Sequence, residues 1–326
     1  MSIAEQVRPE LAPRIGSAIA SVLNDVIKGK SGQVANAIVA LLAGGHLLLE
    51  DVPGVGKTRL ARSIAVAIGG QFARVQATPD LLPQDLTGSN IFDRSTNSFV
   101  FQPGPVFANV VLVDELNRTT PRTQSALLEA MEEHQVSIEG KSYKLPVPFF
   151  LVATQNPLEH HGTYPLPEGQ LDRFMIAMQL GYPDHADELS VLQAGAQGAL
   201  HDALRPACAL EDLIAARREV KGIHVSQPVL EYVLNLIKAT RTVPGVMIGA
   251  SPRAGLALVA ASQARAAMLS RGYVLPDDVK ALAPNVLAHR IVFAGAGQSD
   301  HRSGDALIRK LLTTTPVPVA AQGAPV

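Results

Sequence analysis

Short runs of apolar residues alternate with longer amphipathic stretches through the first half of the chain. Five runs have the length and composition of buried strands: residues 47–49, 72–77, 110–113, 149–154 and 175–180. Between them, apolar residues return at helical spacing, as Leu60, Ile64 and Ile68 do. Strands that alternate with helices form parallel crossovers, and the helices then cover both faces of the sheet. The pattern therefore predicts an α/β domain built on a parallel sheet.

Helical periodicity dominates the rest of the chain. Two helices are expected before the first strand, over residues 1–30 and 33–42. After residue 181 the chain is rich in Ala and Leu, without strand-like alternation, and five more helices are expected: residues 184–197, 210–221, 228–241, 254–271 and 276–290. The last residues are rich in Pro and Ala without periodicity, which indicates disorder. We therefore divide the chain into an α/β domain (1–181), a smaller all-α domain (182–312) and a disordered tail (313–326).

Two insertions interrupt the α/β pattern, and both predict β-hairpins. The first covers about residues 85–105, with apolar residues on both sides of a polar turn. In the second, residues 136–145, the pair Gly140-Lys141 suits a two-residue type II′ turn, which would pair Ile138 with Tyr143. The alternative is that both insertions are ordinary edge strands of the main sheet.

Composition and charge narrow the class of protein. The 326 residues include 47% hydrophobic and 17% charged residues, which are globular values, and the net charge is −1. Acidic and basic residues are interspersed, unlike the basic surface of a nucleic-acid-binding protein. The N-terminus lacks a signal-peptide pattern, no apolar stretch is long enough to span a bilayer, and Cys208 is the single cysteine. We expect a cytoplasmic protein that does not bind membranes, and the charge distribution does not favour nucleic acid as a partner.

A glycine-rich loop follows the first predicted strand and leads into a helix. Consecutive backbone N–H groups at a helix N-terminus can bind a phosphate. Lys57 can reach the β- and γ-phosphates, and the Thr58 hydroxyl can bind Mg²⁺. Asp51 stands where the G-x-x-x-x-G-K-[ST] pattern has its first glycine, and Pro53-Gly54 is expected to supply the turn instead. The sequence predicts that a nucleoside triphosphate is bound by Pro53, Gly54, Val55, Gly56, Lys57, Thr58 and Arg59.

Polar residues at the ends of two later strands complete a predicted hydrolytic site. Asp114 and Glu115 follow the apolar run at 110–113, which would place Asp114 beside Mg²⁺ and Glu115 near the γ-phosphate. A carboxylate there can orient or activate the attacking water. Asn156 follows the run at 149–154 and could hold that water if its strand lies between the other two. These residues predict Mg²⁺-dependent ATP hydrolysis.

Five motifs occur in a fixed order: Gly-x-Gly-Lys-Thr, Leu-Val-Asp-Glu-Leu-Asn-Arg, Ala-Thr-Gln-Asn-Pro, Pro-Glu-Gly-Gln-Leu-Asp-Arg-Phe and Gly-Ala-Ser-Pro-Arg-Ala. Together they resemble the MoxR branch of the AAA+ ATPases over about residues 15–312. The resemblance implies an αβα P-loop domain followed by a helical lid. It also implies a ring of identical subunits, usually a hexamer, with ATP bound between neighbours. The two predicted hairpins fit insertions that this branch carries.

The resemblance also implies roles for individual residues. Lys57 and Thr58 belong to the phosphate loop, Asp114 and Glu115 to the metal and the water, and Asn156 to sensing of the γ-phosphate. The segment containing Val26, Ile27 and Gly29 falls where the family closes over the adenine.

Two arginines match motifs of the family. Arg173 matches the arginine finger that completes a neighbouring subunit's site, and Arg253 matches the sensor arginine on the lid. From the residues alone, Arg173 could instead form a surface salt bridge with Asp172 or Glu168, and Arg253 could be a surface residue at a helix start. Arg118 and Arg122 are the alternative arginines for action on a neighbouring subunit.

The leading functional hypothesis is a ring-forming Mg²⁺-ATPase that remodels a client protein. The resemblance implies a chaperone role in maturation or metal-cofactor insertion, often with an adaptor that carries a von Willebrand factor A domain. One alternative is a motor on nucleic acid, which the hairpin residues Arg94, Lys141 and Lys144 would contact. A second is a nucleotide-gated scaffold with little turnover, and a third is the motor subunit of a magnesium chelatase.

Overall fold

The computed structural model of the chain describes residues 8–156, 162–196, 204–294 and 301–318. Its centre is a five-stranded sheet in the order β2-β5-β8-β1-β9, with all neighbours parallel. The strands are β1 (Leu47–Glu50), β2 (Phe72–Gln76), β5 (Val110–Asp114), β8 (Phe150–Gln155) and β9 (Ile176–Met178). Each lies within a run that the hydrophobic pattern marks as a strand, or extends it by one residue. The predicted α/β fold with a parallel sheet is confirmed.

The strands contribute alternate side chains to two cores, one on each face of the sheet. Leu47 and Leu49 of β1 join the core formed with α1 (Leu11–Val26), α2 (Ser31–Ala43) and α3 (Lys57–Ala67). Leu48 joins the opposite core, where α5 (Pro121–Glu133) packs. A run such as Leu47-Leu48-Leu49 is apolar throughout because helices cover both faces.

The second half of the chain is helical, as predicted. Its helices are α7 (His185–Ala196), α8 (Leu210–Lys221), α9 (Gln227–Thr242), α10 (Pro252–Met268), α11 (Pro276–Leu287) and α12 (His301–Thr314). The sequence analysis did not predict α12, which includes the first two residues assigned to the disordered tail. The tail residues 319–326 and the first seven residues of the chain lie outside the described residues. Two short strands, β10 (Val246–Ile248) and β11 (Val292–Phe293), form an antiparallel pair that was also not predicted.

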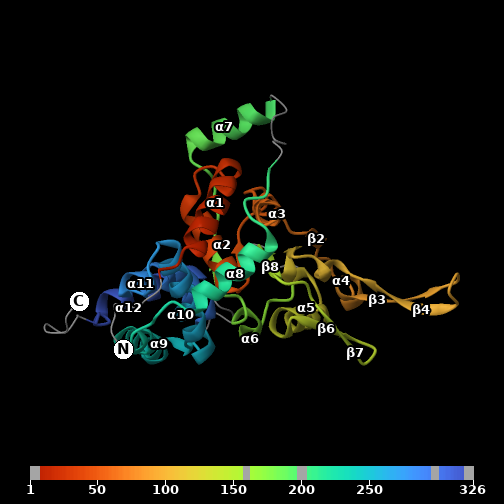
Figure 1. Cartoon of the computed structure of the whole chain (residues 1–326). Helices are drawn as coiled ribbons and strands as arrows, with labels where there is room; N and C mark the ends of the chain where they lie inside the picture. Colours follow the sequence, from red (N-terminus) through yellow and green to blue (C-terminus); the bar gives the residue numbers. More distant parts are fainter. Residues whose placement is uncertain (1–7, 157–161, 197–203, 295–300, 319–326) are drawn as a thin grey trace.

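The lid helices pack directly against the first two helices of the chain. Helix α1 contacts α8 and α10, and α2 contacts the same two helices (Figure 1). The carboxylate of Glu219, on α8, accepts hydrogen bonds from the backbone N–H groups of Glu10, Leu11 and Ala12 at the start of α1. One continuous hydrophobic core therefore crosses the predicted boundary at residue 181, and the division into domains stays a prediction.

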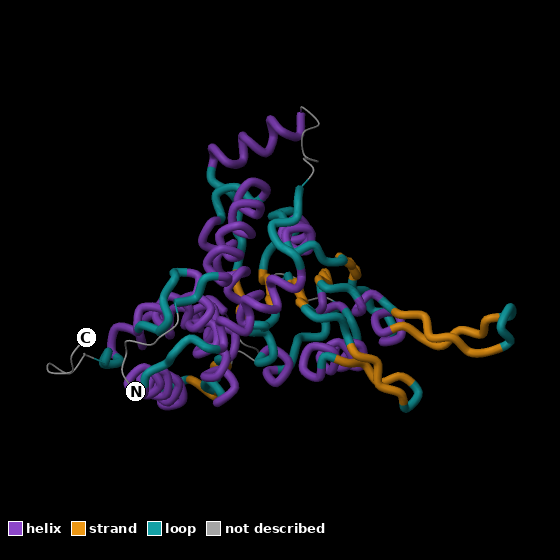
Figure 2. The backbone as a smooth tube through the Cα atoms, in the orientation of Figure 1, coloured by secondary structure: helices purple, strands orange, loops and turns teal. Residues whose placement is uncertain are grey.

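Both insertions form separate β-hairpins, so the edge-strand alternative is wrong. Strands β3 (Gly88–Asp93) and β4 (Ser98–Pro103) pair only with each other, as do β6 (Gln135–Ile138) and β7 (Lys141–Lys144). Figure 2 shows the two hairpins extending on the same side of the molecule, away from the lid helices. Shorter helical segments fill connections: α4 (Pro83–Thr87), α6 (Glu168–Leu171), η2 (Pro105–Phe107), η3 (Leu116–Arg118) and η5 (Ala288–Arg290).

The predicted register of the second hairpin is wrong by two residues. Ile138 pairs with Lys141, and Val136 pairs with Tyr143. The turn residues are Glu139 and Gly140, whose φ angles are 49° and 78°. Two consecutive positive φ angles characterise a type I′ turn, which matches the twist of a hairpin. A shift of two residues leaves the same side chains on the same face, so Val136 remains buried.

Among the described residues, no helix combines the length and the apolar character that crossing a bilayer requires.

A buried histidine joins the start of β1 to its neighbours. His46 Nδ1 accepts a hydrogen bond from the N–H of Leu151, at 3.0 Å, so Nε2 carries the proton and donates to the carbonyl of Met131, at 3.2 Å. Burial lowers the pKa of His46 to about 4. The neutral ring therefore holds three elements together: β1, β8 and α5.

We expect stability to depend on pH through His46. Its pKa is lower in the folded protein, so its contribution is complete above about pH 6.5 and is lost as the pH falls toward 4. A pKa shift of this size corresponds to roughly 3 kcal/mol in the free energy of unfolding. His46→Gln should flatten the pH dependence of the free energy of unfolding, measured with urea between pH 7.5 and 5. His185→Gln, at an exposed position, is the control, and an unchanged slope in His46→Gln would contradict the assignment.

Candidate functional site

The phosphate loop connects β1 to α3 and has the backbone conformation that a phosphate site requires. Gly54 and Gly56 have φ angles of 90° and 95°, which side-chain-bearing residues rarely adopt. A Cβ atom placed on either glycine would meet no atom within 4 Å, so the loop faces open space. Gly56 is the N-cap of α3 and has no side chain to occupy the first N–H groups of the helix. No N-cap side chain therefore competes with an anion for these groups.

Asp51 fixes the loop to the segment that leads into the lid. Its buried carboxylate accepts hydrogen bonds from the backbone N–H groups of Leu180 and Gly181. The Asp51 carbonyl accepts a hydrogen bond from Lys57 Nζ, at 2.6 Å. The departure from the usual glycine therefore has a structural role, beyond the turn that Pro53-Gly54 was expected to provide.

The acidic pair lies at the carboxyl end of β5. Asp114 is buried and pairs with Arg74 of β2, with 2.7 Å between Nε and Oδ2. Thr154 of β8 donates a hydrogen bond to Asp114 Oδ1 at 3.4 Å, and its Oγ1 accepts one from the N–H of Glu115 at 2.9 Å. Neighbouring strands on both sides thus hold the end of β5 in place.

Glu115 has a left-handed backbone conformation, with φ of 60°. Its carboxylate oxygen Oε2 accepts a hydrogen bond from Gln76 Nε2 at 2.9 Å and lies 3.1 Å from Arg118 Nε. Arg118, one of the alternative arginines, therefore contacts the acid of its own chain. The sequence analysis missed Gln76 and Arg74. The pairing of β2 with β5 would have indicated both, because Gln76 is in register with Asp114 and Arg74 lies two residues earlier on the same face of β2.

Asn156 follows β8 directly and is buried. Strand β8 lies between β5 and β1, which is the strand order that the hypothesis for Asn156 required. The role assigned to this amide stays a prediction.

The segment predicted to close over the adenine lies near the same edge of the sheet. Val26 ends α1, and Gly29 adopts a φ of 67°. A Cβ on Gly29 would collide with the carboxylate of Asp187, at the start of α7. Lys30 Nζ donates to the carbonyl of Tyr182 at 2.6 Å, next to the residues that Asp51 binds. Residues 26–30, the linker at 180–182 and the phosphate loop are thus connected.

A site of this composition fits Mg²⁺ with a nucleotide phosphate. Thr58 and Asp114 offer a hydroxyl and a carboxylate, oxygen ligands of the kind that Mg²⁺ takes together with phosphates and waters. Among the residues that the structure describes, no three His, Cys, Asp or Glu side chains gather into an all-protein metal site.

Arg173 lies at the opposite edge of the sheet. It precedes β9, and the N–H of Met175 bonds to the carbonyl of His46, the residue before β1. The phosphate loop follows the other end of β1. Four residues of strand separate the two edges by roughly 13 Å. Arg173 therefore lies at the edge of the sheet opposite the phosphate loop of its own chain.

Arg253 lies beside Arg173, because both pair with Glu132 at the end of α5. The distance from Arg173 Nε to Glu132 Oε2 is 2.8 Å, and Arg253 Nη2 contacts the other carboxylate oxygen. Hydrogen bonding from Arg173 is the main cause that lowers the pKa of Glu132. The partner of Arg173 is thus neither Asp172 nor Glu168, the two residues anticipated from the sequence. Neither arginine meets the phosphate loop of its own chain.

Comparison with known proteins agrees with the fold. Residues 46–176 match the family model described as "ATPase family associated with various cellular activities (AAA)", and residues 238–311 match the AAA lid domain. A crystal structure of a candidate ATPase from Cytophaga hutchinsonii has a TM-score of 0.85 and 35% identity, covering 95% of this chain and 96% of that one. The fold and the site together define an AAA ATPase domain with its lid.

Two relatives are similar to this chain over most of its length. Protein YeaC of Bacillus subtilis is 45% identical, over 95% of this chain and 97% of the relative. Chaperone MoxR1 of Mycobacterium tuberculosis is 38% identical, over 90% of this chain and 80% of that protein. The chain belongs to the MoxR family of AAA+ ATPases.

Replacing Asp51 should destabilise the protein, because two backbone N–H groups lose a charged acceptor. Hydrogen bonds to charged groups contribute about 1.5–3 kcal/mol each, so we expect Asp51→Ala to lower the free energy of unfolding by roughly 3 kcal/mol. The free energy of unfolding of Asp51→Asn should lie between that of Asp51→Ala and that of the wild type. Asp277→Asn, at a side chain 84% exposed, should cost less than about 1 kcal/mol. Urea unfolding measures all three, and a wild-type value for Asp51→Ala would refute this role.

Proposed function

We propose that the protein is a Mg²⁺-dependent ATP hydrolase whose active site forms between two copies of the chain. The observation that carries this proposal is the separation of the site into two halves. The phosphate loop, Asp114 and Glu115 lie at the carboxyl edge of the sheet, and Arg173 and Arg253 lie at the amino edge. The arginines of one copy can then complete the site of the next.

Each group at the carboxyl edge has a chemical task in this proposal. The N–H groups at the start of α3 and the Lys57 ammonium bind the phosphates, while Thr58 and Asp114 bind the metal. Mg²⁺ neutralises charge on the phosphates when it is bound. Glu115 orients and activates the attacking water, and Asn156 senses the γ-phosphate. Gln76 and Arg118 hold the Glu115 carboxylate at the end of its strand.

A contact that uses opposite edges of the sheet is heterologous, and such contacts form a closed ring when the rotation between neighbours closes and an open filament when it does not. We propose a homo-oligomeric ring, with six subunits as in the family pattern, in the cytoplasm. Hydrolysis then depends on assembly, because a guanidinium supplied by a neighbour can accelerate phosphoryl transfer by about 10³–10⁵.

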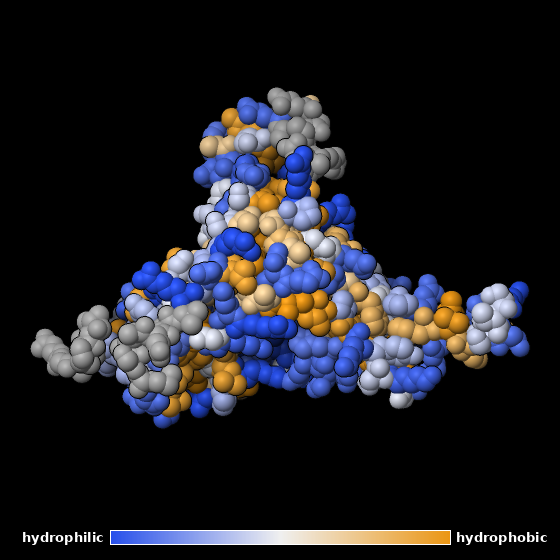
Figure 3. Space-filling view, viewed as in Figure 1, coloured by the Kyte–Doolittle hydropathy of each residue, from blue (hydrophilic) through white to orange (hydrophobic). Residues whose placement is uncertain are grey.

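We further propose that the ring remodels client proteins, together with an adaptor carrying a von Willebrand factor A domain. The name of the relative Chaperone MoxR1 supports the chaperone role. The projecting β3–β4 hairpin offers an exposed apolar surface, seen at its outer part in Figure 3. Phe92 and Phe99, which are 51% and 72% exposed, pack against each other there.

Mixing two inactive variants tests whether the site is shared. Glu115→Gln and Arg173→Ala should each bind ATP but lose more than about 100-fold in turnover. In a mixture of the two, some interfaces combine the phosphate-loop half of the site (the phosphate loop, Asp114 and Glu115) from an Arg173→Ala subunit with Arg173 from a Glu115→Gln subunit. Random assembly of equal amounts should restore about one quarter of the wild-type rate. ATPase activity at a fixed total protein concentration measures this recovery.

The control is a mixture of Glu115→Gln with Lys57→Ala, in which every site lacks a residue of the phosphate-loop half. This mixture should stay inactive. If Arg173 acted on the site of its own chain, the mixture of Arg173→Ala with Glu115→Gln would also stay inactive. Unchanged turnover in Glu115→Gln alone would refute hydrolysis at this site.

A further inference from the structure

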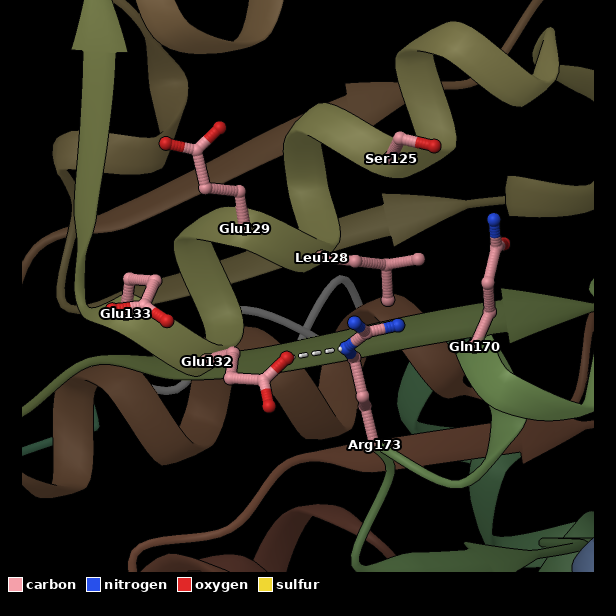
Figure 4. Close-up of a pocket in the computed structure, with 7 residues that line it drawn as sticks. All are labelled: Ser125, Leu128, Glu129, Glu132, Glu133, Gln170 and Arg173. Atoms are coloured by element: carbon pink, nitrogen blue, oxygen red, sulfur yellow. Dashed lines mark hydrogen bonds and ion pairs between the residues drawn. The ribbon is translucent and has the colours of Figure 1, made fainter.

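Glu132 binds both arginines that the proposed function assigns to a neighbouring site. It lies in the last turn of α5, whereas Arg173 lies between α6 and β9 and Arg253 in the first turn of α10. Figure 4 shows its carboxylate turned toward Arg173, while Glu129 and Glu133 on the same helix point away. One acidic side chain therefore joins an arginine of the α/β domain to an arginine of the lid.

This arrangement contributes little to folding stability. The side chains of Glu132, Arg173 and Arg253 are 34%, 31% and 45% exposed. Ion pairs with this exposure usually contribute about 0–1 kcal/mol. A carboxylate beside two arginines also competes with phosphate for their N–H groups. Its presence is explained if it fixes the directions of the two arginine side chains. The geometry supports this explanation.

The hydrogen bonds of Arg173 leave part of its guanidinium available. Nε donates to Glu132 Oε2, and Nη1 donates to the carbonyl of Gly169 at 3.1 Å. A guanidinium has five N–H donors, so these two bonds leave three for another acceptor. Glu132 thus binds the side of the guanidinium nearest the stem and fixes its plane, and the outer N–H groups remain for a phosphate.

A second carboxylate fixes the backbone beneath the two arginines. Asp172 Oδ2 accepts a hydrogen bond from Ser251 Oγ at 2.9 Å, and Ser251 caps α10 through the N–H of Ala254. Asp172 Oδ1 accepts one from Arg290 Nε at 2.7 Å. The buried Arg290 also donates to the carbonyls of Asp172 and Phe174. The loop before Arg173 and the start of the helix bearing Arg253 are therefore joined rigidly.

We propose that Glu132 is a positioning residue that holds Arg173 and Arg253 as one unit, oriented toward the nucleotide of the adjacent copy. This proposal rests on the proposed function, in which both arginines act on a neighbouring site. Asp172 and Arg290 set the positions of the two backbones, and Glu132 sets the directions of the two side chains.

The test compares Glu132→Gln with Glu133→Gln, which removes the same charge one residue later. Misplacement of a catalytic group by about 1 Å can cost about 100-fold in rate. We expect Glu132→Gln to lower kcat by about 10- to 100-fold in the assembled protein, with the Kd for ATP within two-fold of wild type. Glu132→Asp keeps the charge on a shorter stem and should recover part of kcat. Glu133→Gln should match the wild type.

Single-turnover rates in a background that lacks both arginines, Arg173→Ala/Arg253→Ala, provide a second readout. Glu132→Gln should change that residual rate less than two-fold, because both arginines that it positions are absent. A melting temperature close to that of Glu133→Gln would show that the loss of rate is not a loss of folding. A large further loss of rate in the Arg173→Ala/Arg253→Ala background would overturn the positioning role.

Other outcomes separate this inference from the proposed function. If Arg173→Ala is slow but Glu132→Gln turns over like the wild type, the positioning role is wrong and the shared site stands. If Glu132→Gln is faster than the wild type, Glu132 competes with the phosphate for the arginines, which also overturns the proposal. If Arg173→Ala itself turns over normally, the shared site fails.

Discussion

The parallel direction of the five strands is the constraint on which the site depends. Because parallel strands end at the same edge, β1, β5 and β8 bring together the phosphate loop, the Asp114-Glu115 pair and Asn156, which are far apart in the sequence. The same constraint places the residues that precede β9 at the other edge. Arg173 cannot join the half-site of its own chain while β1 and β9 remain paired. The sheet that builds the nucleotide site thus separates it from the arginines.

The hydrophobic pattern was sufficient to predict the sheet, because strands covered on both faces are apolar at every position. The phosphate loop and the Asp114-Glu115 pair were also predictable, since their chemistry is local and their spacing is that of a strand followed by a turn. The helices α8 and α11 begin at the predicted residues. In each case the information lies within a few neighbouring residues.

The features that the sequence analysis missed depend on contacts between distant segments. Gln76 reaches Glu115 only because β2 pairs with β5, and Asp51 reaches Gly181 only because β9 lies beside β1. The partner of Arg173 was also missed, since Glu132 is 41 residues away. The strand pair of the lid is short and depends on tertiary packing. Helix α12 is different, because Leu307, Ile308 and Leu311 recur at helical spacing and could have indicated it from the sequence. The turn of the second hairpin follows strand twist, which residue preferences indicate only in part.

Helix α5 connects the two halves of the proposed site within one chain. Its first turn follows η3, whose Arg118 contacts Glu115, and its last turn carries Glu132. Near the start of α5, the buried Gln124 Nε2 donates to the carbonyls of Thr119 and Tyr164, which fixes the helix to the turn after Glu115. A change at Glu115 that displaced this turn would therefore move Glu132 and the arginines that it binds. Because those arginines serve the adjacent copy in the proposed ring, α5 connects one nucleotide site with the next.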